Sequence, residues 1–210
     1  MEESTSREKI LKKVRKALVE KGNSEYLNAD FTSPLFTEES EIPEIIFAKN
    51  FIEQKGNFIF CRNDEEAFGL LKEIFIQNNW NNPEFHEEEI FYYAEKAGIN
   101  KLNKNDEVNK ISITLCECLV ASTGSILISS AQEISTRLTV NCKIHIVIAF
   151  TSQIVNTISD SLQYIEKKYL NNQPRQLTYI TGASKTADIE QQLVYGAHGP
   201  KEIFCFLIEN

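Results

Sequence analysis

TYITGASKTADIEQQLVYGAHGP, the stretch from Thr178 to Pro200, joins a short β-type run to a turn of small residues, TGASKT at positions 181–186. The turn holds one cation and three hydroxyl groups, and the residues after it have a helix-like pattern. A strand, a polar turn and a helix N-terminus together present free backbone N–H groups and the positive end of a helix dipole. This order therefore predicts a site for a small anion such as a phosphate or a carboxylate.

Individual residues in this stretch have both ligand-binding and architectural interpretations. Lys185 would add a point charge for the anion, and Asp188 would cap the helix or orient Lys185. His198, in a second turn, is the best candidate acid/base because its unperturbed pKa lies near neutrality. The architectural alternative is that Gly182 supplies a positive φ, that Ser184 or Thr186 caps a helix, and that His198 bonds to nearby carbonyls.

Composition limits the classes of function. The chain has 210 residues and a formal net charge of −8, without a Lys/Arg cluster, which argues against a nucleic-acid partner. The longest apolar runs are too short to span a bilayer, and the acidic N-terminus is not typical of a signal peptide, so we expect a cytoplasmic protein. The 5 cysteines match no zinc or iron–sulfur spacing. We therefore expect no metal and no cluster, only an unknown small anionic ligand.

The first 40 residues are set apart from the rest of the chain. Thr5 and Glu8 form a capping box ahead of an amphipathic helix with a basic polar side, and the residues from 23 to 43 look irregular. We expect an N-terminal helix and linker over 1–40 and an α/β domain over 41–210. The helix is a candidate for docking on the body of the protein or on a second subunit.

The following segments alternate between helix and strand patterns. We expect a helix around 45–52, a buried strand at 58–61, a helix capped by Asp64, a short strand at 83–86 and a helix from Glu88 to Ala97. Two β-rich runs, 111–120 and 125–130, flank a turn that pivots on Gly124. A strand at 143–150 contains His145, which we expect to be a hydrogen-bonded core or interface residue. A helix capped by Thr151 or Ser152 and a buried last strand at 203–208 complete the pattern, which predicts a mainly parallel sheet.

The pair Cys116-Glu117-Cys118 lies inside the first β-rich run. One intervening residue on a strand places both thiols on the same face. No second Cys/His pair completes a metal site, so we interpret these thiols as structural. Cys61, Cys142 and Cys205 lie in or beside strand-like runs, where thiols are commonly buried.

Several segments together resemble one family. They are ASTGS at 121–125, Arg137, the strand around His145, TGASKTADIE at 181–190 and HGP at 198–200. Their order and spacing are similar to those of the LUD domain, specifically the lactate utilization protein C group, over roughly residues 40 to 208. Departures from the family pattern are Ser122, where an acidic residue is common, Ala183 in place of Pro, Lys185 in place of Arg, and Asn141-Cys142 where a proline is usual.

The resemblance implies a three-layer α/β/α fold with a mainly parallel sheet, similar to the NagB/RpiA/CoA transferase-like fold. It also implies a role in the oxidation of L-lactate to pyruvate, together with iron–sulfur partner proteins that carry the clusters. Whether this chain is itself catalytic stays open, as does homo-oligomer formation. The alternatives are a stand-alone enzyme acting on a phosphorylated or CoA-linked small molecule and a non-catalytic scaffold subunit.

The candidate site residues come from the turns named above. Arg137 could hold a ligand carboxylate through a bidentate pair, with a salt bridge to Asp188 or Glu190 as the alternative. The hydroxyls of Thr123 and Ser125 could bond an anion, or bond within their own turn. The predicted catalytic residues are His198 and Asp188, no metal ligand is predicted, and the predicted ligand-binding residues are Thr123, Gly124, Ser125, Arg137, Gly182, Ser184, Lys185, Thr186 and Gly199.

Overall fold

A four-stranded, all-parallel sheet lies at the centre of the fold, which is known from a computed structural model. The structure describes residues 41–85, 87–99, 111–132, 139, 141–187, 193–195 and 199–210. The strand order is β1 (Asn57–Cys61), β10 (Glu202–Ile208), β5 (Ile144–Phe150) and β2 (Ile111–Thr114). The helix and linker expected over 1–40 lie outside the described residues. The predicted parallel sheet is confirmed.

The last strand, β10, occupies an inner position in this sheet. It pairs with β5 over seven positions, from Glu202↔Ile144 to Ile208↔Phe150, and with β1 on its other side. Its alternate side chains enter two different cores, which explains the continuous apolar sequence. β1 lies at the edge and is only partly buried, unlike the buried strand that we expected at 58–61. The expected strand at 83–86 is reduced to one bridge, Glu84↔Ser112.

A second, mixed sheet was not expected. Its order is β6 (Ile154–Val155), β3 (Cys118–Val120), β4 (Ser125–Ser129) and β7 (Leu177–Ile180). The β-rich run at 111–120, expected as a single strand, is interrupted at 115–117, so β2 joins the parallel sheet and β3 joins the mixed sheet. The 3₁₀ turn η1 (Ala121–Thr123) connects β3 to antiparallel β4, which confirms the predicted turn.

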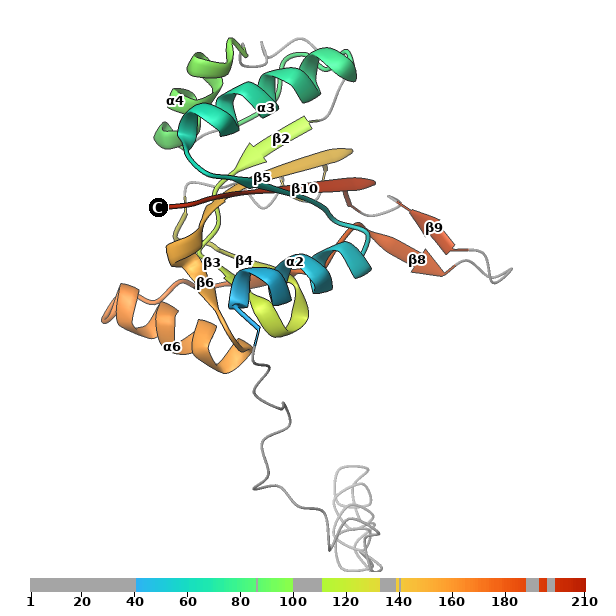
Figure 1. Cartoon of the computed structure of the whole chain (residues 1–210). Helices are drawn as coiled ribbons and strands as arrows, with labels where there is room; N and C mark the ends of the chain where they lie inside the picture. The colour runs from blue at the N-terminus through green and yellow to red at the C-terminus, as the bar shows by residue number, and fades with distance from the viewer. Residues whose placement is uncertain are drawn as a thin grey trace, which may run out of the picture. The chain divides into compact units, whose positions relative to one another are not determined.

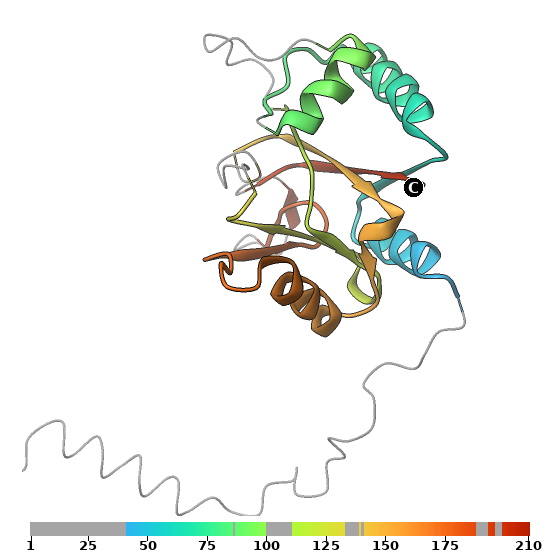
Figure 2. The same cartoon turned by 90° about the vertical axis from the view of Figure 1, so that its left-hand side faces the viewer.

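Helices cover the outer faces of both sheets (Figures 1 and 2). α3 (Asp64–Gln77) and α4 (Glu88–Ala97) pack on one face of the parallel sheet. α2 (Pro43–Glu53) inserts Phe47 and Phe51 into the core that the two sheets share, and α6 (Ile158–Tyr169) covers the far face of the mixed sheet. The expected three layers are therefore corrected to helices, parallel sheet, mixed sheet and helix, because the second sheet supplies an additional layer.

Two helices begin at different residues than expected. The α3 N-cap is Asn63, not Asp64, since its side chain accepts a bond from the N–H of Glu66 at 2.9 Å. The α6 N-cap is Thr157, which forms a capping box with Asp160. Thr151 and Ser152 instead belong to the 3₁₀ turn η2 (Thr151–Gln153). In both cases the side-chain oxygen that meets the free N–H groups of the first turn determines where the helix starts.

The segment after the turn at 181–184 corrects the sequence interpretation. β7 ends at Ile180 as expected, but the next residues form β8 (Lys185–Ala187), which pairs antiparallel with β9 (Leu193–Tyr195). The helix expected here is therefore wrong for Lys185–Ala187 and Leu193–Tyr195, the described residues of this segment, which form strands. None of the described helices is long and apolar enough to cross a membrane.

Candidate functional site

Gly124, in the first predicted ligand-binding turn, lies against the backbone of α2. Its φ is +60°, and a Cβ built on it would lie 2.4 Å from the backbone N of Phe51. Asn50 reinforces this approach, because its Nδ2 donates to the carbonyl oxygen of Ala121 at 2.8 Å. Both observations show that a glycine is required here by helix packing, independently of any ligand.

Gly182, in the second turn, lies against the same end of the same helix. Its φ is +77°, and a Cβ on it would lie 2.2 Å from the carbonyl oxygen of Gln54, the C-cap residue of α2. The Nζ of Lys185 donates to the Oε1 of Gln54 at 3.3 Å. The two glycine turns, 121–124 and 181–184, thus meet at a helix C-terminus, which carries partial negative charge. The sequence predicted the opposite polarity at this place.

Hydroxyl groups also gather beside these glycine turns. The Oγ of Ser125 and the Oγ1 of Thr181 are 2.7 Å apart, which links the start of β4 to the end of β7. The hydroxyls of Ser122 and Thr123 are buried and have no hydrogen-bond partner among the described residues. Two buried hydroxyls without partners are unusual, since most such groups are satisfied. They are the feature of the glycine turns that helix packing leaves unexplained.

Gly199 and Pro200, the described residues of the predicted turn at 196–200, lie beside the second glycine turn. The backbone N–H of Ser184 donates to the carbonyl oxygen of Pro200 at 3.0 Å, and a Cβ on Gly199 would lie 3.0 Å from the Cβ of Ser184. The structure therefore brings Ser184 and Gly199 together, just ahead of β10. Arg137, Asp188 and His198 lie outside the described residues, as does the side chain of Thr186.

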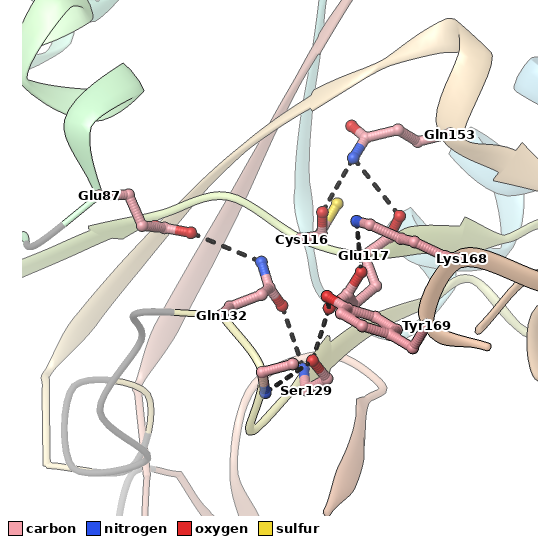
Figure 3. A network of polar contacts seen from close by, with 9 residues as sticks. Glu87, Cys116, Glu117, Ser129, Gln132, Gln153, Lys168 and Tyr169 are labelled. Carbon is pink, nitrogen blue, oxygen red and sulfur yellow. Dashed lines mark hydrogen bonds and ion pairs between the residues drawn. The ribbon is translucent and has the colours of Figure 1, made fainter. Parts of the chain in front are cut away.

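A second polar cluster, which the sequence analysis missed, surrounds Glu117 (Figure 3). The Glu117 side chain is fully buried in the interruption between β2 and β3. Its Oε1 accepts hydrogen bonds from the Ser129 hydroxyl at 2.5 Å and the Tyr169 hydroxyl at 2.6 Å. Its Oε2 forms an ion pair with the Nζ of Lys168 at 2.7 Å. One carboxylate therefore joins β4 and the end of α6.

The cluster continues towards the parallel sheet through buried Glu87. Glu87 accepts a hydrogen bond from the backbone N–H of Leu115 at 2.8 Å and one from the Gln132 amide at 3.5 Å. Gln132 in turn accepts from the N–H of Ser129 at 3.0 Å, and Gln153 donates to the carbonyl of Cys116 at 2.8 Å. These polar contacts satisfy the backbone where the chain passes from one sheet to the other.

The buried charge changes the proton affinity of its neighbours. Burial works to lower the pKa of Lys168, but the hydrogen bond and the charge of Glu117 outweigh it and raise that pKa. The pKa of Tyr169 is raised mainly by burial and secondly by the hydrogen bond to Glu117. Burial also raises the pKa of the Cys118 thiol to about 12 and that of the Cys116 thiol well above its usual range. Both thiols are therefore protonated at neutral pH, which is consistent with the structural role expected of them.

We expected Cys116 and Cys118 to lie on the same face of a strand, but the structure places them on different faces. Cys116 precedes β3 and packs in the core between the sheets, whereas Cys118 packs under α6. The alternation expected of a strand does not apply, because the strand begins only at Cys118. The sequence signal for this cluster is a lone Glu inside an apolar β-type run.

His145 is the one histidine among the described residues, and it is fully buried as expected. Its Nε2 lies 2.9 Å from the Thr114 hydroxyl, and its Nδ1 has no hydrogen-bond partner within the described part of the chain. Burial lowers its pKa to about 4, so the imidazole is neutral at pH 7. Within the described ranges no three His, Cys, Asp or Glu side chains are placed to hold a metal ion.

Several curated proteins are similar in sequence to this chain. An uncharacterized protein of Neisseria meningitidis is 34% identical over 92 residues, covering 44% of this chain and 39% of that protein. The lactate utilization protein C of Bacillus subtilis is 30% identical over 123 residues, covering 58% and 51% respectively. That of Oceanobacillus iheyensis is 23% identical over 196 residues, covering 88% and 76%. This chain thus spans about two fifths of the length of the first of these curated relatives and about half that of the second.

A solved structure and a family match complete the comparison. A DUF162 family protein from Deinococcus radiodurans superposes with a TM-score of 0.55 at 15% identity, covering 79% of this chain and 96% of that one. At this identity the likeness concerns the fold alone. Residues 45–208 match the LUD domain, a span that contains both glycine turns and Glu117. This chain therefore belongs to the LUD domain family.

Proposed function

We propose that this chain is a component of an L-lactate utilization system, in which L-lactate is oxidised to pyruvate together with iron–sulfur partner proteins. The observation that carries the proposal is the LUD domain match over residues 45–208, combined with relatives named lactate utilization protein C. The role in lactate utilization is inferred from the family assignment, and the iron–sulfur partners are inferred from the resemblance of the sequence to that family.

The ligand in this proposal is a small carboxylate held at the glycine turns. The unpartnered hydroxyl of Thr123 and the paired hydroxyls of Ser125 and Thr181 offer donors, and Lys185 offers an exposed positive charge beside them. The partial negative charge at the C-terminus of α2 disfavours a bound anion, so the positive charge of Lys185 has to offset it. Its ammonium bonds the uncharged Gln54 amide, a contact that a carboxylate can replace at little cost.

Growth on L-lactate tests the role. The full chain is expressed in a Bacillus subtilis strain whose growth on L-lactate depends on its own lactate utilization protein C, with wild type, Lys185→Ala and Lys167→Ala compared. We expect wild type and Lys167→Ala to restore growth, because Lys167 is an exposed lysine in the last turn of α6 and belongs to neither glycine turn. Soluble wild-type protein that fails to restore growth with the partners expressed alongside would contradict the role.

Thermal unfolding of the purified chain tests the ligand separately. L-lactate or pyruvate at about 100 times its dissociation constant is expected to stabilise the wild type by about 2.7 kcal/mol. Lys185→Ala should lose most of this shift, whereas Lys167→Ala should keep it. If growth is restored but neither anion stabilises the wild type, the lactate role stands and the carboxylate site is wrong.

A further inference from the structure

A cavity of about 420 Å³ lies in the helical layer formed by α3 and α4. Its walls are the last turns of α3, the connection at 79–82, and residues 97–99, which are the last residue of α4 and the two residues after it. These elements belong neither to the glycine turns nor to the Glu117 cluster. The volume lies within the range of small-molecule sites, which is roughly 300–1,000 Å³.

Trp80 forms a fixed wall of this cavity. Its backbone N–H donates to the carbonyl oxygen of Phe75 at 2.8 Å. Its ring meets the rings of Phe75 and Phe204 edge-on, with centroid distances of 5.7 and 5.5 Å. Because Phe204 belongs to β10, the indole is anchored on the parallel sheet. A rigid aromatic wall lowers the entropy lost when a ligand binds.

Three asparagines form the polar part of the cavity. Asn79 and Asn82 have left-handed backbones, with φ of 53° and 51°, and Asn81 lies exposed between them. Asparagine tolerates this conformation better than most residues, which by itself suffices for a turn. Asn81 donates one amide N–H to the carbonyl oxygen of Asn79 at 3.4 Å, and its own amide oxygen and second N–H can still accept from and donate to a ligand. That combination suits hydroxyl groups, which both donate and accept.

The electrostatics of the cavity favour an uncharged ligand. The C-terminal ends of both α3 and α4 meet there, and helix C-termini carry partial negative charge. Lys72, at the same cavity, contributes one opposing positive charge. Exposed Ile76 and partly buried Ile99 add apolar surface beside Trp80. The site thus combines an aromatic wall, apolar patches and amides, without a dominant charge.

We propose that this cavity binds a sugar ring, either as a free sugar or as part of a nucleoside. A sugar ring presents C–H groups on its faces and hydroxyls around its edge, which match the indole and the asparagine amides respectively. This ligand differs from the carboxylate of the lactate proposal and binds elsewhere on the chain, so the two proposals fail or stand separately.

The intrinsic fluorescence of the full chain tests this proposal directly, since Trp80 is its single tryptophan. Monosaccharides and nucleosides are titrated into the wild type, Asn81→Ala and Asn171→Ala. We expect a saturable change in Trp80 emission with at least one of these compounds, and an affinity about fivefold weaker for Asn81→Ala because one hydrogen bond is lost. Asn171→Ala, an exposed asparagine after α6, should titrate like the wild type.

Two further comparisons distinguish a free sugar from a nucleoside and an uncharged ligand from a charged one. If only nucleosides change the fluorescence, the base also contributes to binding. If free sugars change it as well, the sugar ring alone is sufficient. Lys72→Ala should change the affinity less than about twofold if the ligand is uncharged. Absence of a saturable response to every sugar and nucleoside, an equal response to phosphate or lactate, or unchanged affinity in Asn81→Ala would each overturn the proposal.

Discussion

The two glycine turns and the Glu117 cluster are opposite cases of how sequence relates to function. The turns are conspicuous in the sequence, and their glycines are explained mainly by the close approach of α2 to Gly124 and Gly182. Glu117 is inconspicuous, a single charge between two cysteines, yet it is fully buried and contacts three side chains from β4 and α6. A glycine motif is thus evidence of backbone proximity before it is evidence of a ligand.

The comparison also separates local from distant causes. Gly182 requires glycine because its own φ is +77° and the Gln54 carbonyl blocks a side chain. Glu117 is stabilised only because Lys168 and Tyr169, far along the chain, reach the same point. A buried carboxylate without such partners would be strongly unfavourable. The following predictions test this distinction, beginning with the largest expected effect.

Replacing Glu117 should destabilise the fold most. Glu117→Ala leaves the hydroxyls of Ser129 and Tyr169 without their acceptor and creates a cavity, so we expect a loss of about 4 kcal/mol in the free energy of unfolding. Urea denaturation measures it. The control is Glu166→Ala, an exposed carboxylate on α6, expected within about 0.5 kcal/mol of the wild type. Equal stabilities of the two variants would show that the cluster contributes little to the fold.

Replacing Gly182 should have the next largest effect. Gly182→Ala combines a left-handed backbone, which costs about 1–2 kcal/mol, with a clash against Gln54, for a total of about 3 kcal/mol. Gly98→Ala is the matched control, because Gly98 has a φ of +70° but a Cβ added to it would meet nothing within 4 Å. The difference between the two unfolding free energies therefore isolates the close approach of α2. If both variants lose the same stability, backbone strain alone explains the glycine.

The smallest effect concerns the pH dependence that His145 introduces. The unfolded chain protonates this imidazole near pH 6.5, whereas the folded chain resists protonation down to about pH 4. The unfolded state therefore binds more protons in this window, and stability falls as the pH falls through it. Between pH 7 and pH 5 we expect His145 to account for a loss of about 2 kcal/mol.

Urea unfolding of the wild type and His145→Gln at both pH values measures this contribution. Because the substitution itself alters the stability at pH 7, the quantity compared is the change between the two pH values. His145→Gln should lose about 2 kcal/mol less than the wild type on acidification. An identical change in both proteins would mean that other groups control the acid response.

Much of the fold was predictable, because its signals are local. The apolar strands at 143–150 and 203–208, the α4 helix ended by Gly98 and the turn at Gly124 follow from patterns within a few residues. The second sheet was not predictable in the same way. The β-type run from Ile111 to Val120 contains no Gly or Pro, and only pairing with distant strands divides it into β2 and β3.

The candidate site was predictable as a set of turns but not as an arrangement. The structure brings Ser125 to Thr181 and Ser184 to Pro200, so the two halves of the motif are neighbours. It replaces the expected helix after Ser184 with β8 and places a helix C-terminus there instead. The roles assigned to His198, Asp188 and Arg137 stay predictions, since these residues lie outside the described part of the chain.

The sequence by itself determined the LUD family resemblance, the α/β class, the buried last strand and the burial of His145, because apolar periodicity and turn chemistry act over short distances. Only the tertiary structure decided which end of which helix faces the glycine turns and which acidic residue is buried. Both depend on contacts between segments such as Gln54 with Gly182, or Glu117 with Lys168, that lie far apart in the chain. Charge and backbone polarity act through space, and the fold alone sets those distances.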